Sequence, residues 1–151
     1  MKDYTIITGA SSGIGYELAS LFAEDKHNII LVARNEERLK KVKDKLSTAD
    51  IDIKILALDL ANMNDCDKLI NFVEKNNIDI NILVNNAGIT RDTLMLRMTE
   101  EQWDMVLNIN LKSAFNFIHA VSPIMMKQRG GSIINMSSVV GVSGNAGQCN
   151  Y

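Results

Sequence analysis

Short apolar runs that alternate with amphipathic segments constrain this chain more than any other feature. Each run is rich in Ile, Val and Leu and is apolar on successive residues rather than on alternate ones. Strands with that pattern are buried on both faces, as in a parallel sheet covered by helices. The sequence therefore predicts strands at residues 4–9, 28–33, 53–60, 80–88 and 131–138.

Segments of helical period separate these strands. Residues 64–77 predict one helix, and a longer one runs from about Glu100 to Gly130, with Pro123 bending it rather than ending it. Two earlier helices have apolar faces made of Ile14, Leu18, Leu21 and Phe22, and of Leu39, Val42 and Leu46. Alternating strands and helices predict an α/β fold with right-handed crossovers and helices on both faces of a parallel sheet. No linker or repeat divides the sequence, so one domain is expected over residues 1–151.

Composition excludes several classes of function. The chain of 151 residues is 46% hydrophobic and 23% charged, with a net charge of −2 and a pI near 5.7, so no positive surface is expected for nucleic acid. No run has the length of a membrane span or a signal peptide, which favours a cytoplasmic protein without a membrane partner.

The cysteines and histidines do not indicate a metal or redox site. Cys66 and Cys149 are expected as reduced thiols. His27 and His119 have no partner at ligand spacing, so no metal site is expected.

The stretch TGASSGIG, Thr8 to Gly15, lies where the first predicted strand turns into the first helix. Its glycines permit a tight turn and close approach of a ligand, and free N–H groups at a helix start favour a phosphate. The spacing departs from the common G-x-G-x-x-G pattern, because three residues separate the first two glycines. The alternative is a tight strand-to-helix loop that binds nothing.

This motif and five later ones, in order, resemble the short-chain dehydrogenase/reductase family. The later ones are Asp59 after the third strand, NNAG at 85–88, Asn110, Ser138 and Tyr151. The resemblance covers the whole chain. From residue 88 onward it is closest to the 3-oxoacyl-[acyl-carrier-protein] reductases, whereas the first half is similar to the family in general.

The resemblance implies a Rossmann-type doubly wound parallel sheet of about five strands in the order 3-2-1-4-5, with the fifth strand as an uncovered edge. It also implies a dinucleotide site. Gly9, Ser11, Ser12, Ile14 and Gly15 would hold the pyrophosphate and adenosine ribose, Asp59 and Leu60 would flank the adenine, and Asn86, Ala87 and Gly88 would line the cofactor. Alternatively, Asp59 is an exposed strand-end acid, and Asn86 and Gly88 only shape a turn.

The end of the second strand bears on the choice of cofactor. An acid there would bind the ribose 2′-hydroxyl of NAD, whereas an arginine would neutralise the 2′-phosphate of NADP. The chain has Ala33 followed by Arg34, which favours NADP(H). Against this, Arg34 could be a solvated helix-start residue, or Glu36 and Glu37 could pair with it.

The resemblance implies an NADPH-dependent carbonyl reductase acting on a small-molecule or carrier-bound 3-oxoacyl substrate. Tyr151 would supply a proton to the carbonyl oxygen, Ser138 would hydrogen-bond the same oxygen, and Asn110 would hold a water for proton replenishment. The alternative for Asn110 is a satisfied helix residue, and for Ser138 a turn hydroxyl. The family's catalytic Lys would fall beyond Tyr151, so the chain is expected to be an inactive N-terminal portion, from an incomplete gene product or an artificial shortening.

Two other functions stay open: a non-catalytic dinucleotide-binding module and a fragment that self-associates. A homo-oligomer is expected, because the long helix packs against its symmetry mate in the family. Phe115, Phe117, Ile118, Met125 and Met126 are its candidate surface residues.

Overall fold

The fold is a parallel sheet of five strands in the order β3-β2-β1-β4-β5. The computed structural model describes residues 2–151. The strands are β1 (Lys2–Thr8), β2 (Asn28–Ala33), β3 (Ile53–Ala57), β4 (Ile78–Asn85) and β5 (Ser132–Asn135). All four pairings between neighbouring strands are parallel. The predicted strands and their order are confirmed, and the architecture is the Rossmann-type doubly wound sheet.

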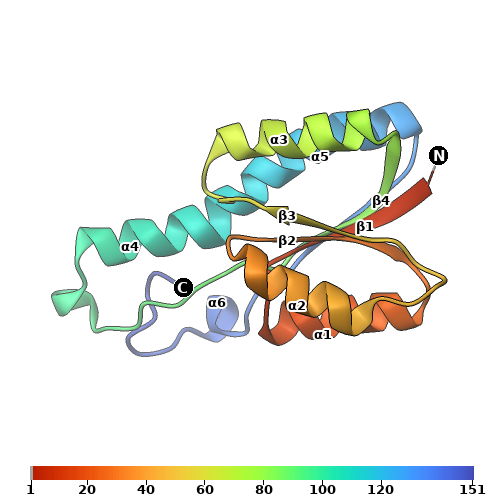
Figure 1. The fold of residues 1–151 in the computed structure, drawn as a ribbon. Coiled ribbons are helices and arrows are strands. Elements are labelled where there is room, and N and C mark those ends of the chain that lie inside the picture. The colour runs from red at the N-terminus through yellow and green to blue at the C-terminus, as the bar shows by residue number, and fades with distance from the viewer. Residues whose placement is uncertain (1) are drawn as a thin grey trace.

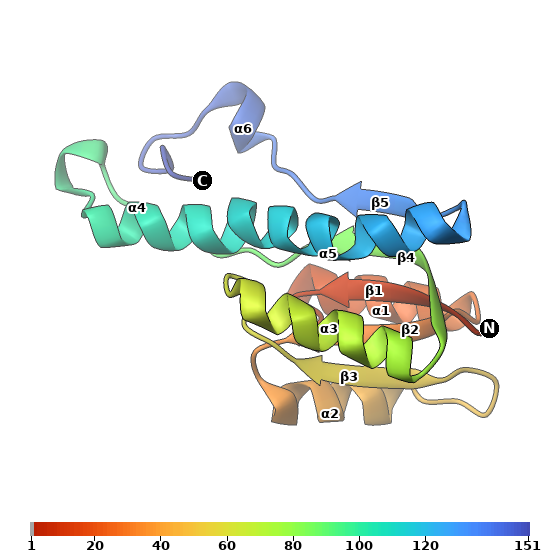
Figure 2. The ribbon, with the colours of Figure 1, turned by 90° about the horizontal axis from the view of Figure 1, so that it is seen from above.

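Helices cover both faces of this sheet (Figure 1). One face carries α1 (Gly13–Glu24) and α2 (Glu36–Leu46), and the other carries α3 (Met63–Lys75) and α5 (Ser113–Gln128). Seen from above, α3 and α5 lie side by side over the sheet (Figure 2). A short helix, α6 (Val140–Ser143), follows β5.

The two layers of helices give two hydrophobic clusters, one on each face of the sheet. The first is centred on side chains such as Ile30, Leu69, Leu83 and Phe117 and packs under α3 and α5. The second joins β1, β2 and β4 to α1 and α2. Strands such as β2, buried from Ile29 to Ala33, therefore contribute side chains to both clusters, which explains their continuous apolar runs.

The predicted long helix is continuous but has three parts. It begins as α4 (Glu100–Val106), widens into the π-helical segment η2 (Leu107–Lys112), and continues as α5. The helix passes through Pro123, as predicted, and ends at Gln128, where Arg129 adopts a left-handed conformation with φ 59°. Its start is fixed by a capping box between Thr99 and Gln102.

Two predictions about helix faces were wrong in part, although Leu18 and Phe22 of α1 pack against the second cluster as predicted. Ile14 and Leu21 of α1 are exposed, because Gly15 and Ala19 are the residues with which this helix approaches the sheet. On α5, Phe117 and Met125 lie in the core rather than on an oligomer surface, because that side of the helix packs on β4. Ile118 is also packed against this cluster. The exposed apolar side chains of the long helix include Leu111, Phe115 and Met126.

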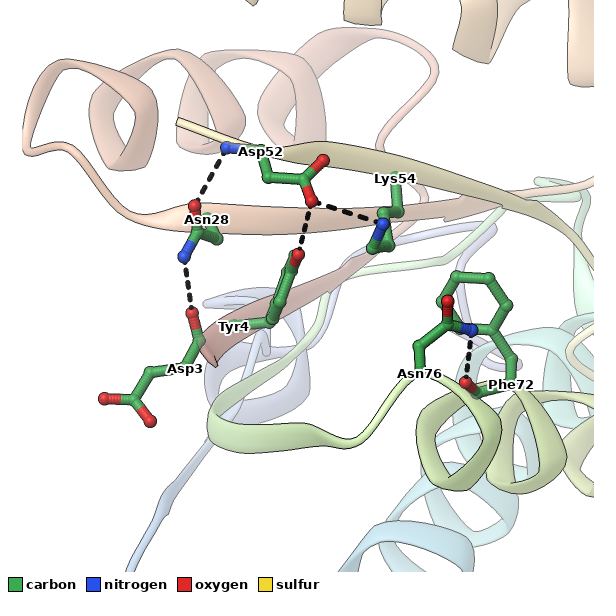
Figure 3. Close-up of polar contacts among 7 residues, drawn as sticks. All are labelled: Asp3, Tyr4, Asn28, Asp52, Lys54, Phe72 and Asn76. Atoms are coloured by element: carbon green, nitrogen blue, oxygen red, sulfur yellow. Dashed lines mark hydrogen bonds and ion pairs between the residues drawn. The ribbon is translucent and has the colours of Figure 1, made fainter. Parts of the chain in front are cut away.

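A polar network ties β1, β2 and β3 together near the amino ends of the strands (Figure 3). Tyr4 Oη donates to Asp52 Oδ2 at 2.6 Å, and Lys54 Nζ lies 3.2 Å from the same oxygen. Asn28 bridges the strands, since its Oδ1 accepts from Asp52 N and its Nδ2 donates to Asp3 O. Figure 3 also shows the end of α3, where Asn76 Nδ2 donates to Phe72 O.

Strand β5 forms one edge of the sheet, as expected. All four of its residues are exposed, in contrast to the buried residues of β1, β2 and β4. Among residues 2–151, no helix has the length and apolar character needed to cross a bilayer.

Candidate nucleotide-binding and catalytic site

A cleft of about 280 Å³ lies where the carboxyl ends of β1, β2, β3 and β4 meet. Crevices at this end of a doubly wound sheet are where such folds bind ligands. Eight of the residues expected to contact a dinucleotide line the cleft, namely Gly9, Ser11, Ser12, Arg34, Asp59, Leu60, Ala87 and Gly88. Ile14, Gly15 and Asn86 do not line it.

The β1–α1 turn is close-packed against the end of β4. Gly9 has φ 66°, and a Cβ there would lie 2.9 Å from Ala87 Cα. A Cβ on Gly15 would lie 2.7 Å from Asn86 Nδ2. Both positions therefore exclude a side chain, and the role of Gly15 in the structure is packing of helix against strand end.

The opposite side of the same turn is open. Gly13 has φ 56°, and no atom lies within 4 Å of the position that a Cβ would take. Ser12, the N-cap of α1, makes no side-chain capping hydrogen bond. The N–H groups of the first turn of α1 thus have no side-chain acceptor from the cap, and an anion can approach them.

A buried hydroxyl holds the turn after β4 in place. Thr8 Oγ1 accepts from Asn86 N at 3.0 Å and from Ala87 N at 3.1 Å, and it donates to Val84 O at 3.2 Å. Asn86 Nδ2 donates to Thr8 O at 3.1 Å. The Asn86 side chain therefore shapes the strand end, which was the alternative interpretation of this residue, while Ala87 and Gly88 face the cleft.

Two arginines line the cleft at the end of β2. Arg34 follows the strand, and Arg38 lies in the first turn of α2, where its N–H is held by Asn35 Oδ1 at 2.9 Å. Glu36 pairs with Lys40 at 2.7 Å, and no ion pair involves Arg34 or Arg38 among residues 2–151. Arg38 was not predicted as a site residue; the signal in the sequence is its place in the first turn of the helix that follows the second strand.

The end of β3 is fixed by two further contacts. Asp65 Oδ2 accepts from Asp59 N at 2.7 Å, and Lys68 lies 2.6 Å from Asp65 Oδ1. The Lys68 ammonium and the Asp59 N–H together hold the pKa of Asp65 below its usual range. Leu60 O accepts from Nδ2 of the buried Asn116. Asp59 Oδ1 accepts a hydrogen bond from Ala61 N, and Asp59 lines the cleft.

Asn110 lies in η2, and its side chain holds a segment of main chain. Its Oδ1 accepts from Ile89 N at 2.8 Å and its Nδ2 donates to Ile89 O at 2.9 Å. Ile89 itself lines the cleft. The amide of Asn110 is thus engaged in positioning the cleft wall.

Ser138 and Tyr151 lie in the segments that follow β5. Ser138 is half-buried and its Oγ accepts from Val140 N at 3.2 Å, which leaves its hydroxyl hydrogen available to donate. Tyr151 is 42% exposed, and its N–H donates to Gln148 O. No hydrogen bond joins the side chains of Ser138 and Tyr151 in the described part of the chain.

Size alone does not single out this cleft. An adjoining depression of about 550 Å³ shares Arg34 and Asp59 with it and has Glu100, Glu101 and Asp104 of α4 on its other side. A depression of about 1030 Å³ lies at the opposite end of the sheet, near Asp3, Asp79 and Lys127. Eight of the expected site residues line the cleft, and none of them lines that larger depression.

The histidines lie outside the cleft. His27 Nδ1 is 3.4 Å from Thr5 Oγ1, and its ring meets Phe22 edge-on. His119 stacks beside Phe115. Within residues 2–151 there is no group of three or more His, Cys, Asp or Glu side chains placed to hold a metal ion.

Comparison with known proteins gives the family. The family model described as short chain dehydrogenase matches residues 3–151, nearly the whole chain. The chain belongs to the short-chain dehydrogenase family. The glycine-rich turn, the 3-2-1-4-5 sheet and the cleft at its carboxyl edge are therefore features of a short-chain dehydrogenase.

Individual relatives share a single description. The chain is similar to proteins named 3-oxoacyl-[acyl-carrier-protein] reductase from Staphylococcus aureus, at 40% identity over 152 residues, and from Thermotoga maritima, at 42% over 146. A third, from Chlamydia trachomatis, is 43% identical over 148 residues. These matches cover 100%, 97% and 97% of this chain but 62%, 59% and 59% of the relatives. The chain thus spans about 60% of the length of these relatives.

Proposed function

We propose that this chain is the dinucleotide-binding part of an NADP(H)-dependent 3-oxoacyl-[acyl-carrier-protein] reductase. The observation that carries the proposal is the cleft at the carboxyl edge of the sheet, with a glycine-rich turn at one side and Arg34 and Arg38 at the other. The names of the relatives support the substrate class, a 3-oxoacyl group carried by acyl carrier protein.

The residues of the cleft fit a dinucleotide. The open side of Gly13 and the uncapped start of α1 suit the pyrophosphate, whose negative charge is favoured at the positive end of a helix dipole. Asp59 and Leu60 line the adenine end, and Ala87, Gly88 and Ile89 form the opposite wall. Asn86 and Gly15 support that wall by packing, not by contact with the ligand.

The cofactor is NADP(H) rather than NAD(H). Ala33 ends β2 without an acid to bind a ribose 2′-hydroxyl, and two guanidinium groups without carboxylate partners in the described residues face the cleft instead. Arginine suits a phosphate because its fork of N–H donors forms paired, charge-assisted hydrogen bonds.

Calorimetric titration of the chain with NADPH and NADH tests this choice. We expect NADPH to bind more tightly, and Arg34→Ala or Arg38→Ala to narrow the gap by about 1–2 kcal/mol each. Lys40→Ala is the matched control, because it removes a positive charge from the same helix at a residue that pairs with Glu36 and does not line the cleft. Equal affinities of the parent chain for both nucleotides would contradict the proposal.

NADPH, if held in the cleft, would be the source of the hydride that reduces the carbonyl carbon of the substrate. As the carbonyl oxygen gains negative charge, the Tyr151 phenol donates a proton to it and the Ser138 hydroxyl donates a hydrogen bond. The free hydroxyl hydrogen of Ser138 is consistent with that role. Asn110 acts indirectly, because its side chain holds the main chain of Ile89 at the cleft wall.

The 151 residues alone are proposed to be a poor catalyst. Tyr151 is 42% exposed, and its phenol has no hydrogen-bond partner among residues 2–151, so its position relative to the substrate is weakly held. A misplacement of about 1 Å can cost about 100-fold in rate. NADPH oxidation with an acetoacetyl thioester, compared between this chain and a chain of the relatives' full length, measures the difference. Comparable rates for the two chains would contradict the proposal that the 151 residues alone are a poor catalyst.

A second proposed property is self-association. Leu111 is 66% exposed, Phe115 58% and Met126 78%, and all three lie on η2 or α5 of the long helix. Large apolar side chains on one continuous helix are typical of an interaction surface. We define Leu111, Phe115 and Met126 as the exposed helix face.

A further inference from the structure

Three sulfur atoms converge on the loop that precedes α4. Cys149 Sγ lies 3.4 Å from Met95 Sδ and 3.7 Å from Met98 Sδ. Met95 is the first residue of the short 3₁₀ helix η1 (Met95–Arg97) and Met98 directly follows this helix, whereas Cys149 lies about 50 residues later in the sequence. The fold, not the local sequence, brings these soft ligands together.

Hydrogen bonds hold the two segments against each other on both sides of Cys149. Thr93 N donates to Gly147 O at 2.8 Å, and Gln148 Nε2 donates to Asp92 Oδ2 at 3.1 Å. The buried Asn150 then donates to Arg91 O and to Gln102 O. The sulfur cluster is therefore built into a fixed contact between segments 91–102 and 147–150 (Figure 1).

The donor set selects one class of ion. A thiolate and two thioethers are soft ligands, which favour Cu(I) over the oxygen-seeking or nitrogen-seeking divalent ions. Within residues 2–151, no group of three or more His, Cys, Asp or Glu side chains is placed to hold a metal ion, so the sulfur cluster belongs to no such group. We propose that Cys149, Met95 and Met98 form a binding site for a soft monovalent cation, Cu(I) in the cell and Ag(I) as its laboratory substitute.

The observed distances fit a three-coordinate ion with little movement. Metal–sulfur bonds of about 2.3 Å, the Zn–S length, would place three sulfurs in a trigonal plane about 4 Å apart. The observed separations of 3.4 and 3.7 Å would need to open by about 0.6 and 0.3 Å to reach this spacing. Met95 and Cys149 are exposed, so their side chains can make this adjustment and the ion can reach them.

Binding exchanges a proton for the cation. The Cys149 thiol loses its proton to solvent as the Cu–S bond forms, and the two thioethers donate lone pairs without losing a proton. No electron is transferred, because the ion arrives as Cu(I).

Anaerobic titration of the whole chain with Cu(I), in competition with bicinchoninate, tests the site. We expect one equivalent to bind, and Cys149→Ser, Met95→Leu or Met98→Leu each to weaken binding by about 10-fold or more through loss of one ligand. Met126→Leu, which removes an exposed thioether elsewhere, and Cys66→Ala, which removes the buried thiol, should leave the affinity unchanged. A Met95→Leu/Met98→Leu variant that binds Cu(I) as tightly as the parent would overturn the proposal.

Methionine-methyl NMR gives a second measurement that needs no variant. One equivalent of Ag(I) should shift the methyl resonances of Met95 and Met98 and leave that of Met126 in place. Unmoved Met95 and Met98 resonances would refute the site, as would Zn(II) binding as tightly as Cu(I) in the titration.

Discussion

The side-chain amide of Asn110 binds both main-chain polar groups of Ile89, at 2.8 and 2.9 Å. This pairing joins the π-helical segment η2 to the wall of the nucleotide cleft. The neighbouring Gly88 also lies close to this amide, since a Cβ there would be 3.4 Å from Asn110 Oδ1.

Asn110→Ala should therefore weaken both the fold and the cleft. It leaves the N–H and C=O of Ile89 without their partners, and each unsatisfied group costs about 1–3 kcal/mol if it stays buried from water. We expect a lower free energy of unfolding in urea and weaker NADPH binding. Asn108→Ala, at an exposed position of the same π-helical segment, is the control for stability. Equal losses in the two variants would contradict the role given to the pairing.

Thr8→Val should destabilise the chain although it keeps the shape of the side chain. The hydroxyl oxygen of Thr8 accepts hydrogen bonds from the N–H groups of Asn86 and Ala87, and a valine side chain can accept neither. We expect a loss of about 2 kcal/mol or more in urea unfolding. Thr8→Ser retains the hydroxyl and should lose clearly less; if serine and valine were equally damaging, the hydrogen bonds would not be the cause.

The Tyr4–Asp52 pair should make stability depend on pH at both ends of the scale. The hydrogen bond from Tyr4 is the main cause, and Lys54 the second, that holds the pKa of Asp52 below its usual range. The carboxylate therefore stabilises the fold above about pH 4, and this stabilisation is lost as the pH falls through the folded-state pKa. Burial and the Asp52 contact raise the pKa of Tyr4, so its contribution is present below about pH 10 and is lost above it.

Tyr4→Phe tests this pair. We expect a loss of about 1 kcal/mol near pH 7, less than for a buried charged hydrogen bond because the Asp52 side chain is 36% exposed. The dependence of stability on pH should also become shallower below pH 4 and above pH 10. Tyr16→Phe on α1 is the matched control. A pH profile of Tyr4→Phe that parallels the parent's would refute the coupling.

Self-association should depend on the exposed helix face. The parent chain is expected to be a dimer or larger by light scattering at micromolar concentration, and Leu111→Glu with Phe115→Glu should shift it toward monomer. Leu21→Glu makes the same kind of change at an exposed leucine on the other side of the sheet. A monomeric parent, or a Leu21→Glu variant that dissociates equally, would exclude this face as the interface.

The strand pattern was predictable because the residues of β2 and their neighbours are apolar on both faces, and only a covered parallel sheet satisfies that pattern. The inward face of α1 was not predictable from hydrophobicity. Its close approach depends on Gly15 and Ala19, which have little or no apolar surface to signal it. Phe117 and Met125 were misplaced for a related reason, since the apolar residues of α5 surround most of the helix and only the packing on β4 decides which are buried.

The cleft was predictable where a local motif forms it and less so where distant residues meet. Gly9, Ser11 and Ser12 are adjacent in the sequence, and the strand-to-helix context identifies them. Thr8 and Asn86 are far apart in the sequence, so the hydrogen bonds between them leave no local signal. Whether Ser138 and Tyr151 act as proposed stays a prediction.

The position of β1 has a consequence for synthesis of the chain. Of the five strands, β1 is made before the others and lies at the centre of the sheet, with β2 on one side and β4 on the other. After β1 is completed at Thr8, it cannot form its full pairing with β4 until synthesis has reached Asn85, the end of β4. At about 5–20 residues per second that delay is about 4–15 s. During this time one edge of an apolar strand has no native partner, so β1 is open to wrong pairing until β4 has been made.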